Sequence, residues 1–288
     1  MIADYKAKIT LDSIASYSHW PARLLGLEPF SKKHKSPSEV MREFGDEKWG
    51  ALLEMFSGMS NFTLANVEAK EKDLKAIIPS FDTQLGFYLG ELGKSDIIVM
   101  KYMEDTLKPY SDGASCLVEL GAGYGAKILN LSDILSLNSL DLMAFEYTQS
   151  GCDLINLVAK NSNKNIDVGQ FDFNTLNFDG MQIPENAIIF TSYAIHYVPQ
   201  LRDDFVKFLC QFKPKVVVHF EPCYDYFDQK TIHGLMCRRY MELNGYTKNI
   251  GSSIEAGCKQ VGANIKVQKN VHGTNPFLPF SIIEWEPS

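Results

Sequence analysis

A glycine-rich loop is the first place in this sequence where residue types and spacing indicate chemistry. Residues 118–125 read Val-Glu-Leu-Gly-Ala-Gly-Tyr-Gly, after an apolar run and before a segment with helical periodicity. Glycines let the backbone turn sharply and approach a ligand where a Cβ would collide. A strand, a glycine-rich turn and a helix together form a common nucleotide-binding site. We predict that the ligand-binding residues here are Glu119, Gly121, Gly123, Tyr124 and Gly125.

Two carboxylic acids farther along the chain are typical of a nucleoside site. Glu146 ends the next apolar run, about 20 residues after the loop, where an acid can accept hydrogen bonds from both ribose hydroxyls. Asp172 follows a third apolar run and is placed to accept a hydrogen bond from an adenine amino group. The two acids therefore predict an adenosine-containing ligand.

The charge beside the loop favours a ligand without phosphate. The dinucleotide pattern G-x-G-x-x-G presents a helix N-terminus to a pyrophosphate. This loop instead reads G-x-G-x-G, with Glu119 two residues before Gly121. An acid there suits the cationic methionine end of S-adenosylmethionine (SAM) and is unfavourable beside a pyrophosphate. The predicted cofactor is therefore SAM, with Tyr124 covering its methionine part.

These residues resemble the class I SAM-dependent methyltransferases. The loop is similar to that family's motif I, and Glu146 and Asp172 match the acids after its second and third strands. Segments 195–199 and 275–285 resemble its post-strand-four segment and its reversed last strand. The resemblance, which covers residues 115–288, implies a Rossmann-like α/β fold. Its seven-stranded sheet would be mostly parallel with the last strand antiparallel, and an N-terminal helical lid would cover the acceptor.

The periodicity of the chain changes near residue 111. Residues 1–110 show helical spacing without strand alternation; Ser36 and Glu39 predict a capping box, and Gly45 is expected to end or interrupt the helix that follows. In residues 111–288, short apolar runs alternate with amphipathic segments, which is typical of a parallel sheet covered on both faces. We predict a helical lid over 1–110 and a SAM-binding domain over 111–288. The predicted strands are 116–120, 142–146, 166–171, 187–192, 216–220, 265–271 and 280–285.

Residues after the fourth and fifth predicted strands are candidates for catalysis. His196 is the first candidate for a general base because its unperturbed pKa lies near neutrality, and a packed structural histidine is an equal alternative. Glu221 is the second candidate, as a base or as an anchor for a cationic acceptor, and Tyr193 is expected to line the pocket. The further candidates are Ser192 for the cofactor and Tyr224, His272 and Asn275 for the acceptor.

Composition restricts the partners. The 288 residues carry a formal net charge of −7, whereas nucleic-acid binders usually present a basic face. No apolar run approaches the roughly 20 residues that span a bilayer, and we expect no signal peptide. The six cysteines are scattered without a C-x-x-C pair, which favours reduced thiols in a cytoplasmic protein. We expect no nucleic-acid, membrane or metal partner.

The leading hypothesis is an enzyme that moves a methyl group from SAM to an oxygen or nitrogen of a small-molecule acceptor. A homodimer is one possible assembly of this enzyme. Three alternatives stay open at this point. They are methylation of a protein or peptide side chain, an NAD-dependent oxidoreductase, and a non-catalytic SAM-binding subunit.

Overall fold

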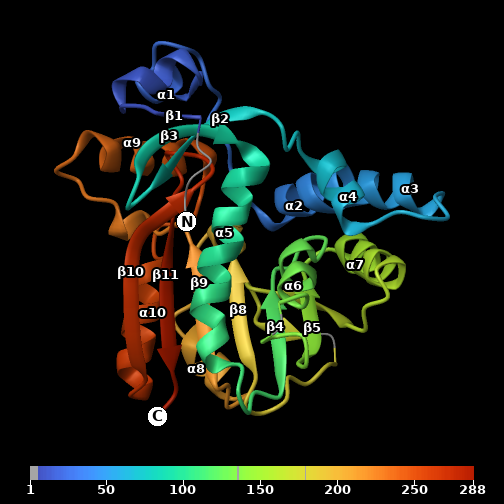
Figure 1. Ribbon diagram of the computed structural model, residues 1–288. Coiled ribbons are helices and arrows are strands. Elements are labelled where there is room, and N and C mark those ends of the chain that lie inside the picture. The colour runs from blue at the N-terminus through green and yellow to red at the C-terminus, as the bar shows by residue number, and fades with distance from the viewer. Residues whose placement is uncertain (1–5, 135, 179) are drawn as a thin grey trace.

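A mixed β-sheet runs through the molecule (Figure 1). The computed structural model describes residues 6–134, 136–178 and 180–288. The strands are β1 (Ala7–Lys8), β2 (Ile77–Asp82), β3 (Gly86–Glu91), β4 (Cys116–Leu120), β5 (Asp141–Glu146), β6 (Asp167–Asp172), β7 (Asn177–Phe178), β8 (Ile188–Ser192), β9 (Val216–Glu221), β10 (Asn264–Gly273) and β11 (Phe280–Glu286). In the described residues these eleven strands follow the order β1-β3-β2-β10-β11-β9-β8-β4-β5-β6-β7.

The helices surround this sheet. The α-helices are α1 (Trp20–Leu24), α2 (Pro37–Val40), α3 (Ala51–Ser57), α4 (Leu64–Glu71), α5 (Leu92–Leu107), α6 (Ala126–Leu131), α7 (Gln149–Asn161), α8 (Phe205–Cys210), α9 (Ile232–Asn244) and α10 (Ile250–Val261). A π-helix, η2 (Met41–Gly50), joins α2 to α3, and short 3₁₀ turns are η1 (Asp12–Ser16), η3 (Lys108–Tyr110), η4 (Ile195–Tyr197) and η5 (Tyr224–Tyr226). None of the described helices is both long and apolar enough to span a membrane.

The seven strands predicted from the sequence form the centre of the sheet. β4 pairs in parallel with β5 and β8, β5 with β6, and β8 with β9, while β11 runs antiparallel to β9 and β10. The predicted mostly parallel arrangement with a reversed last strand is therefore confirmed for these seven. The prediction of seven strands in total is wrong, because β1, β2, β3 and β7 extend the sheet at its two edges.

Four neighbouring strands, β4, β5, β8 and β9, are buried on both faces. Along β4, Leu117 packs in the cluster that includes α5, α6 and α7, whereas Val118 packs in the cluster that includes α8 and α10. This alternation follows from strand geometry, in which successive side chains point to opposite faces. Figure 1 shows α5 crossing the face of the sheet nearest the viewer. The continuous apolar runs in the sequence thus correspond to strands covered on both sides.

The N-terminal segment begins its helical part as the sequence predicts. Ser36 caps α2 by accepting a hydrogen bond from the Glu39 backbone N–H, and Glu39 bonds back to the Ser36 backbone, so the capping box is confirmed. The expected break at Gly45 is wrong, because α2, η2 and α3 continue without interruption from residue 37 to residue 57. The helix instead widens to a π-helix around Gly45, a local change that is frequently found at functional sites.

The prediction that residues 1–110 are helical is also wrong, since β1, β2 and β3 lie in this segment. The hairpin of β2 and β3 pairs with β10 and so extends the sheet beyond the seven central strands. Alternation was not visible because the buried positions of β2 include Ser80 and Asp82, both 0% exposed. Apolar residues normally mark the buried face of a strand, and here polar ones take their place.

A buried network of hydrogen bonds explains why polar residues occupy the buried positions of β2. His272 on β10 contacts Asp82 through Nδ1 (3.3 Å) and Ser95 Oγ through Nε2 (3.2 Å). Asp82 also accepts hydrogen bonds from the Tyr102 hydroxyl (2.9 Å) and the Gln84 backbone N–H (2.8 Å). Burial disfavours the Asp82 carboxylate, but the bonds from His272, Gln84 and Tyr102 outweigh it and lower the pKa of Asp82. The network therefore fastens the N-terminal hairpin and α5 to β10.

Asp82→Asn is expected to destabilise the fold by roughly 1–3 kcal/mol, because it weakens a buried network of charged hydrogen bonds. A carboxyl whose pKa is lowered by folding stabilises the folded protein at pH values above its unfolded-state pKa. This stabilisation disappears as the pH falls through the folded-state pKa. Urea unfolding at pH 7 and at pH 3 measures this difference, which should be smaller at pH 3. The exposed aspartate Asp73→Asn is the control, and equal stability of Asp82→Asn and the unmodified protein would contradict the prediction.

Candidate active site

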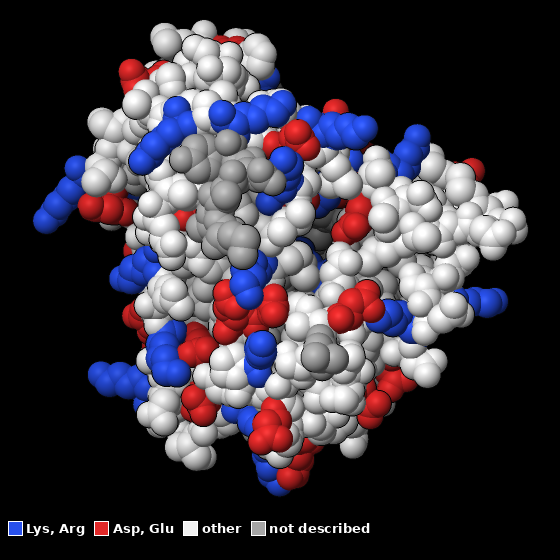
Figure 2. All heavy atoms as spheres, in the orientation of Figure 1, with Lys and Arg blue, Asp and Glu red and all other residues white. Residues whose placement is uncertain are grey.

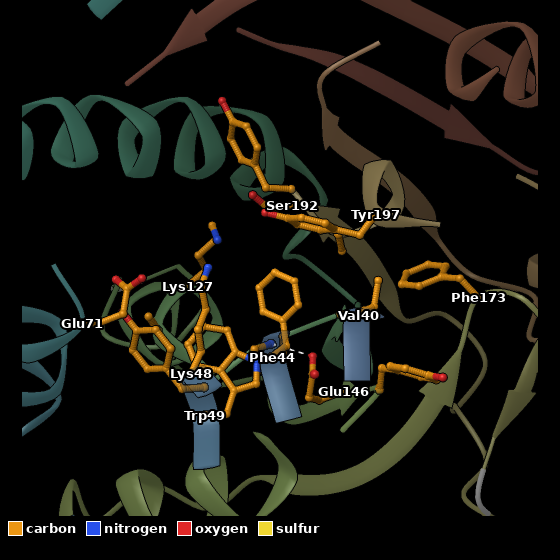
Figure 3. Close-up of a pocket in the computed structure, with 18 of the residues that line it drawn as sticks. Val40, Phe44, Lys48, Trp49, Glu71, Lys127, Glu146, Phe173, Ser192 and Tyr197 are labelled. Atoms are coloured by element: carbon orange, nitrogen blue, oxygen red, sulfur yellow. Dashed lines mark hydrogen bonds between the residues drawn. The ribbon is translucent and has the colours of Figure 1, made fainter. Parts of the chain in front are cut away.

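A cavity of about 310 Å³ lies at the carboxyl ends of β4, β5, β6 and β8. The N-terminal segment supplies the opposite wall through α2, η2, α4 and α5. Figure 3 shows Glu71 and Lys127 toward one end of this cavity, Glu146 and Phe173 toward the other, and Phe44 between them. In open α/β sheets, ligands bind at this edge, where the strand order reverses. The fold therefore places a partly open cavity where the sequence predicted a nucleoside.

The glycine loop turns as its sequence requires. Gly121, Gly123 and Gly125 have φ values of +78°, +59° and +80°, a region that side chains with a Cβ rarely occupy. A Cβ at position 121 would lie 2.4 Å from the Ala194 Cβ, and one at position 123 would lie 3.0 Å from the Trp49 ring. Gly121 and Gly123 line the cavity, so their small size keeps space for a ligand and for Trp49.

Glu146 joins the loop to the cavity. Its Oε2 accepts a hydrogen bond from the Gly123 backbone N–H (3.0 Å), and its Oε1 accepts from the Thr148 N–H (3.2 Å) and hydroxyl (3.1 Å). The residue is 6% exposed and lines the cavity, and its burial raises the pKa of the carboxyl. Oε1 already accepts two hydrogen bonds, whereas Oε2 accepts one and retains a lone pair, so Glu146 can accept one further hydrogen bond from a ligand.

Glu119 and Gly125 lie behind the loop. Glu119 Oε2 accepts a hydrogen bond at 3.2 Å from the Ile128 backbone N–H in the first turn of α6. Neither Glu119 nor Gly125 belongs to the cavity wall. Burial raises the pKa of Glu119 to about 8, so the neutral form dominates at pH 7. The structure thus gives Glu119 a contact that orients the loop and helix, rather than direct access to the cavity.

Four other predicted residues line the cavity: Tyr124, Asp172, Ser192 and Tyr193. Asp172 accepts hydrogen bonds from Asn174 and Thr175, which fixes its carboxylate at the turn after β6. The Tyr193 hydroxyl donates to the Leu278 carbonyl at 3.0 Å, and burial raises its pKa, so it is a poor base. The Ser192 hydroxyl is buried and has no hydrogen-bond partner among the described residues.

His196 and Glu221 form a buried pair outside the cavity wall. Glu221 Oε1 accepts hydrogen bonds from the backbone N–H groups of Ala194 (2.9 Å) and Ile195 (3.1 Å). Its Oε2 lies 3.4 Å from His196 Nδ1, and the two side chains are 0% and 1% exposed. Burial lowers the pKa of His196, although Glu221 opposes the shift. The pair holds the segment 193–198, which carries Tyr193, Ala194 and Tyr197 into the cavity wall.

The three residues predicted for the acceptor do not line this cavity. His272 belongs to the buried network described above. Tyr224 donates a hydrogen bond to Glu242 (2.7 Å), and Asn275 accepts one from the Phe277 backbone N–H (3.0 Å) within its own loop. The turn between β10 and β11 packs against α9 instead of reaching across the sheet edge.

The N-terminal segment contributes cavity residues that the sequence did not predict, notably Phe44, Lys48 and Trp49 from the π-helix. Their spacing is that of ordinary core-facing helix residues, so nothing in the sequence separates a cavity wall from a packed core. This segment is fastened to α7 because the Ser150 hydroxyl donates to the Gly45 carbonyl at 2.7 Å. In the part of the chain that is described, no cluster of His, Cys, Asp and Glu could hold a metal ion.

Comparison with known proteins identifies the fold. No protein-family model matches the sequence, and no curated protein matches it. Among solved structures, magnesium protoporphyrin IX methyltransferase from Synechocystis PCC 6803 with bound S-adenosylhomocysteine (SAH) superposes with a TM-score of 0.52 at 10% identity, over 87% of this chain and 100% of that one. The chain has a SAM-dependent methyltransferase fold. The small RNA methyltransferase HEN1 is similar too, with a TM-score of 0.50 and 15% identity over 70% of this chain. This chain matches only 28% of the length of HEN1.

Proposed function

We propose that this protein transfers a methyl group from SAM to an oxygen or nitrogen of a small molecule enclosed beneath the N-terminal segment. The observation that carries the proposal is Glu146, whose carboxylate accepts the Gly123 N–H and lines the cavity. A pyrophosphate would need that same N–H, and the carboxylate would repel it. The bound SAH in the similar protoporphyrin methyltransferase also supports SAM as the cofactor.

The cavity wall fits SAM in its chemistry. Glu146 would accept a hydrogen bond from a ribose hydroxyl, and Asp172 would accept one from the adenine amino group. Gly121, Gly123 and Tyr124 would lie along the methionine part, while the unpartnered Ser192 hydroxyl offers a further polar contact. Glu119 and Gly125 would act from behind by shaping the loop.

SAM supplies an electrophilic methyl group on a sulfonium. The contribution of the protein is to align an acceptor with that group and to exclude water, and alignment can account for roughly 7–11 kcal/mol of the barrier. The lid residues Phe44 and Trp49 close the cavity over the loop. A base adds perhaps 10²–10⁴-fold and is not obligatory for every acceptor. Positioning is thus the effect that the structure supports most directly.

The wall of the cavity also bears on the alternatives. A peptide or protein acceptor needs an open groove, whereas helices from the N-terminal segment form one wall of this cavity. An NAD-dependent oxidoreductase needs a loop that accepts a pyrophosphate, and Glu146 occupies the Gly123 N–H. A non-catalytic SAM-binding subunit would bind SAM without methylating any acceptor.

Isothermal titration with SAM, SAH and NAD tests the cofactor. We expect binding of SAM and SAH and none of NAD. Radiolabelled SAM incubated with separate pools of metabolites, peptides and small RNA then tests the acceptor, and we expect label in the metabolite pool. NAD binding without SAM binding would overturn the proposal. Label in the peptide or RNA pool alone would retain the cofactor and replace the acceptor class.

His196→Gln separates a catalytic base from a structural residue. Because His196 is buried away from the cavity, we expect lower stability, by roughly 1–3 kcal/mol, and an unchanged shape of the pH–rate profile. The profile of kcat/KM between pH 5 and pH 9 is the measurement. Loss of its acidic limb in this variant would instead support His196 as the general base that the sequence predicted.

A further inference from the structure

One wall of the cavity is acidic and comes entirely from the N-terminal segment. Glu68 and Glu71 on α4 and Asp96 on α5, here called the acidic wall, all line the cavity. Lys72 lies 2.7 Å from Asp96 and 3.9 Å from Glu71. The Asn130 side chain donates a hydrogen bond to Glu68 at 3.0 Å. Figure 2 shows this face of the molecule, which is hollowed beside α5 and carries acidic side chains near the hollow.

Burial and like charges act on Glu68 and on the tyrosine beside the acidic wall. Burial, together with the charges of Asp96 and Glu71, raises the pKa of Glu68. Burial and the same three acids raise the pKa of the neighbouring Tyr124 hydroxyl. Like charges that repel one another in a partly buried space are relieved by a cation. The wall therefore favours a positively charged group.

When every acid in the cavity wall is ionised, the cavity has room for one positive charge beyond that of SAM. The described residues that line it include five acidic and three lysine side chains, which give a net charge of −2 when all are ionised. SAM has a sulfonium, an ammonium and a carboxylate, and therefore a single net positive charge. One negative charge remains uncompensated with SAM bound, and an acceptor with one positive charge would neutralise it.

A second observation points to a ligand in the same space. The Ser192 hydroxyl, on a residue that is 3% exposed, lines this cavity and has no hydrogen-bond partner in the described chain. Figure 3 shows Ser192 across the cavity from Trp49. A buried hydroxyl without a partner costs free energy unless a ligand completes it. A polar group of a ligand is thus expected beside Ser192.

We propose that the acidic wall of Glu68, Glu71 and Asp96 binds the ammonium group of a cationic small-molecule acceptor. The inference rests on the proposed function and narrows its substrate class to amines. Trp49 and Tyr124, whose ring centroids are 5.3 Å apart, supply aromatic faces beside the same wall, and such faces favour a nearby cation.

Matched probe pairs test the inference on the protein saturated with SAH. The pairs are 2-phenylethylammonium with 2-phenylethanol, and butylammonium with butanol, each titrated by calorimetry. We expect at least one ammonium probe to bind about tenfold more tightly than its alcohol, with a preference that falls at high salt. Absence of an ammonium preference in both pairs would overturn the inference.

Glu71→Gln and Asp96→Asn should each reduce that preference to below about threefold, since each removes one charge from the wall. Glu54→Gln, an exposed acid on α3 away from the cavity, is the matched control and should retain it. Thermal melts of all variants show that they remain folded. A preference that survives in both wall variants would contradict the assignment.

Comparing SAH with 5′-methylthioadenosine, which lacks the amino-acid part, identifies the source of the cation. We expect Glu71→Gln to leave the affinities for both nucleosides unchanged within about twofold. If Glu71→Gln weakens SAH alone, the acidic wall holds the ammonium of the cofactor, and the acceptor inference fails while the methyltransferase proposal stands. If the unmodified protein binds neither SAM nor SAH, the methyltransferase proposal itself fails.

Discussion

Replacing Glu146 with alanine is expected to weaken SAH binding by about 10- to 100-fold. The free lone pair of Oε2 can accept a hydrogen bond from a ribose hydroxyl, and such a bond to a charged group contributes roughly 1.5–3 kcal/mol. The substitution also removes the acceptor of the Gly123 N–H, so the loop loses the contact that fixes its bend. Calorimetric titration with SAH gives the affinity directly.

Glu146→Gln refines this prediction because it keeps the shape and removes the charge. We expect about tenfold weaker SAH binding and lower thermal stability, because the amide nitrogen replaces one of the two oxygens that accept the Gly123 and Thr148 N–H groups. Loss of the charge offsets part of that cost, since burial raises the pKa of Glu146 and so disfavours the carboxylate. Asp141→Asn, at the exposed start of the same strand, is the control. An affinity of Glu146→Ala within twofold of that of the unmodified protein would contradict the assignment.

The seven central strands could be predicted because the signal for each lies in its own contiguous residues. β4, β5, β8 and β9 are short runs of mostly apolar residues, and burial on both faces needs no polar alternation. β10 instead alternates apolar and polar residues in its first half, which is an equally local signal. β2 and β3 could not be predicted in this way. Asp82 and Ser80 face inward there, and they are stabilised by Tyr102, Ser95 and His272, two of which lie in α5 and one in β10. A strand whose burial depends on distant partners leaves no periodic signal.

The candidate site divides in the same way. Gly121, Gly123 and Glu146 could be predicted, because the loop and the next strand fix their positions and both elements are contiguous in sequence. The sequence could not predict which polar residues after β8 and β9 face the cavity. Glu221 turns toward the backbone of Ala194 and Ile195, a choice set by the packing of two neighbouring strands. The acidic wall could not be predicted either, since the positions of Glu68 and Asp96 are typical of the solvent-exposed face of an amphipathic helix.

Gly121→Ala is expected to abolish detectable SAH binding and to destabilise the fold by roughly 2–4 kcal/mol. The backbone at this position has a φ of +78°, which costs a residue with a Cβ roughly 1–2 kcal/mol. The added methyl would also lie 2.4 Å from the Ala194 Cβ, and overpacking of this kind typically costs 1–3 kcal/mol. Calorimetry with SAH and urea unfolding measure the two effects.

Two variants separate backbone strain from collision at Gly121. Gly26→Ala has nearly the same φ, +74°, with no atom within 4 Å of its new methyl, so it should show only the strain and no change in SAH affinity. Gly121→Ala combined with Ala194→Gly removes the opposing methyl and should recover part of the stability and of the SAH affinity, a coupling expected only for residues in contact. If the double variant were as impaired as the sum of the single ones, the collision would not be the cause. The close approach of the loop to the segment after β8 would then have no part in shaping the cofactor site.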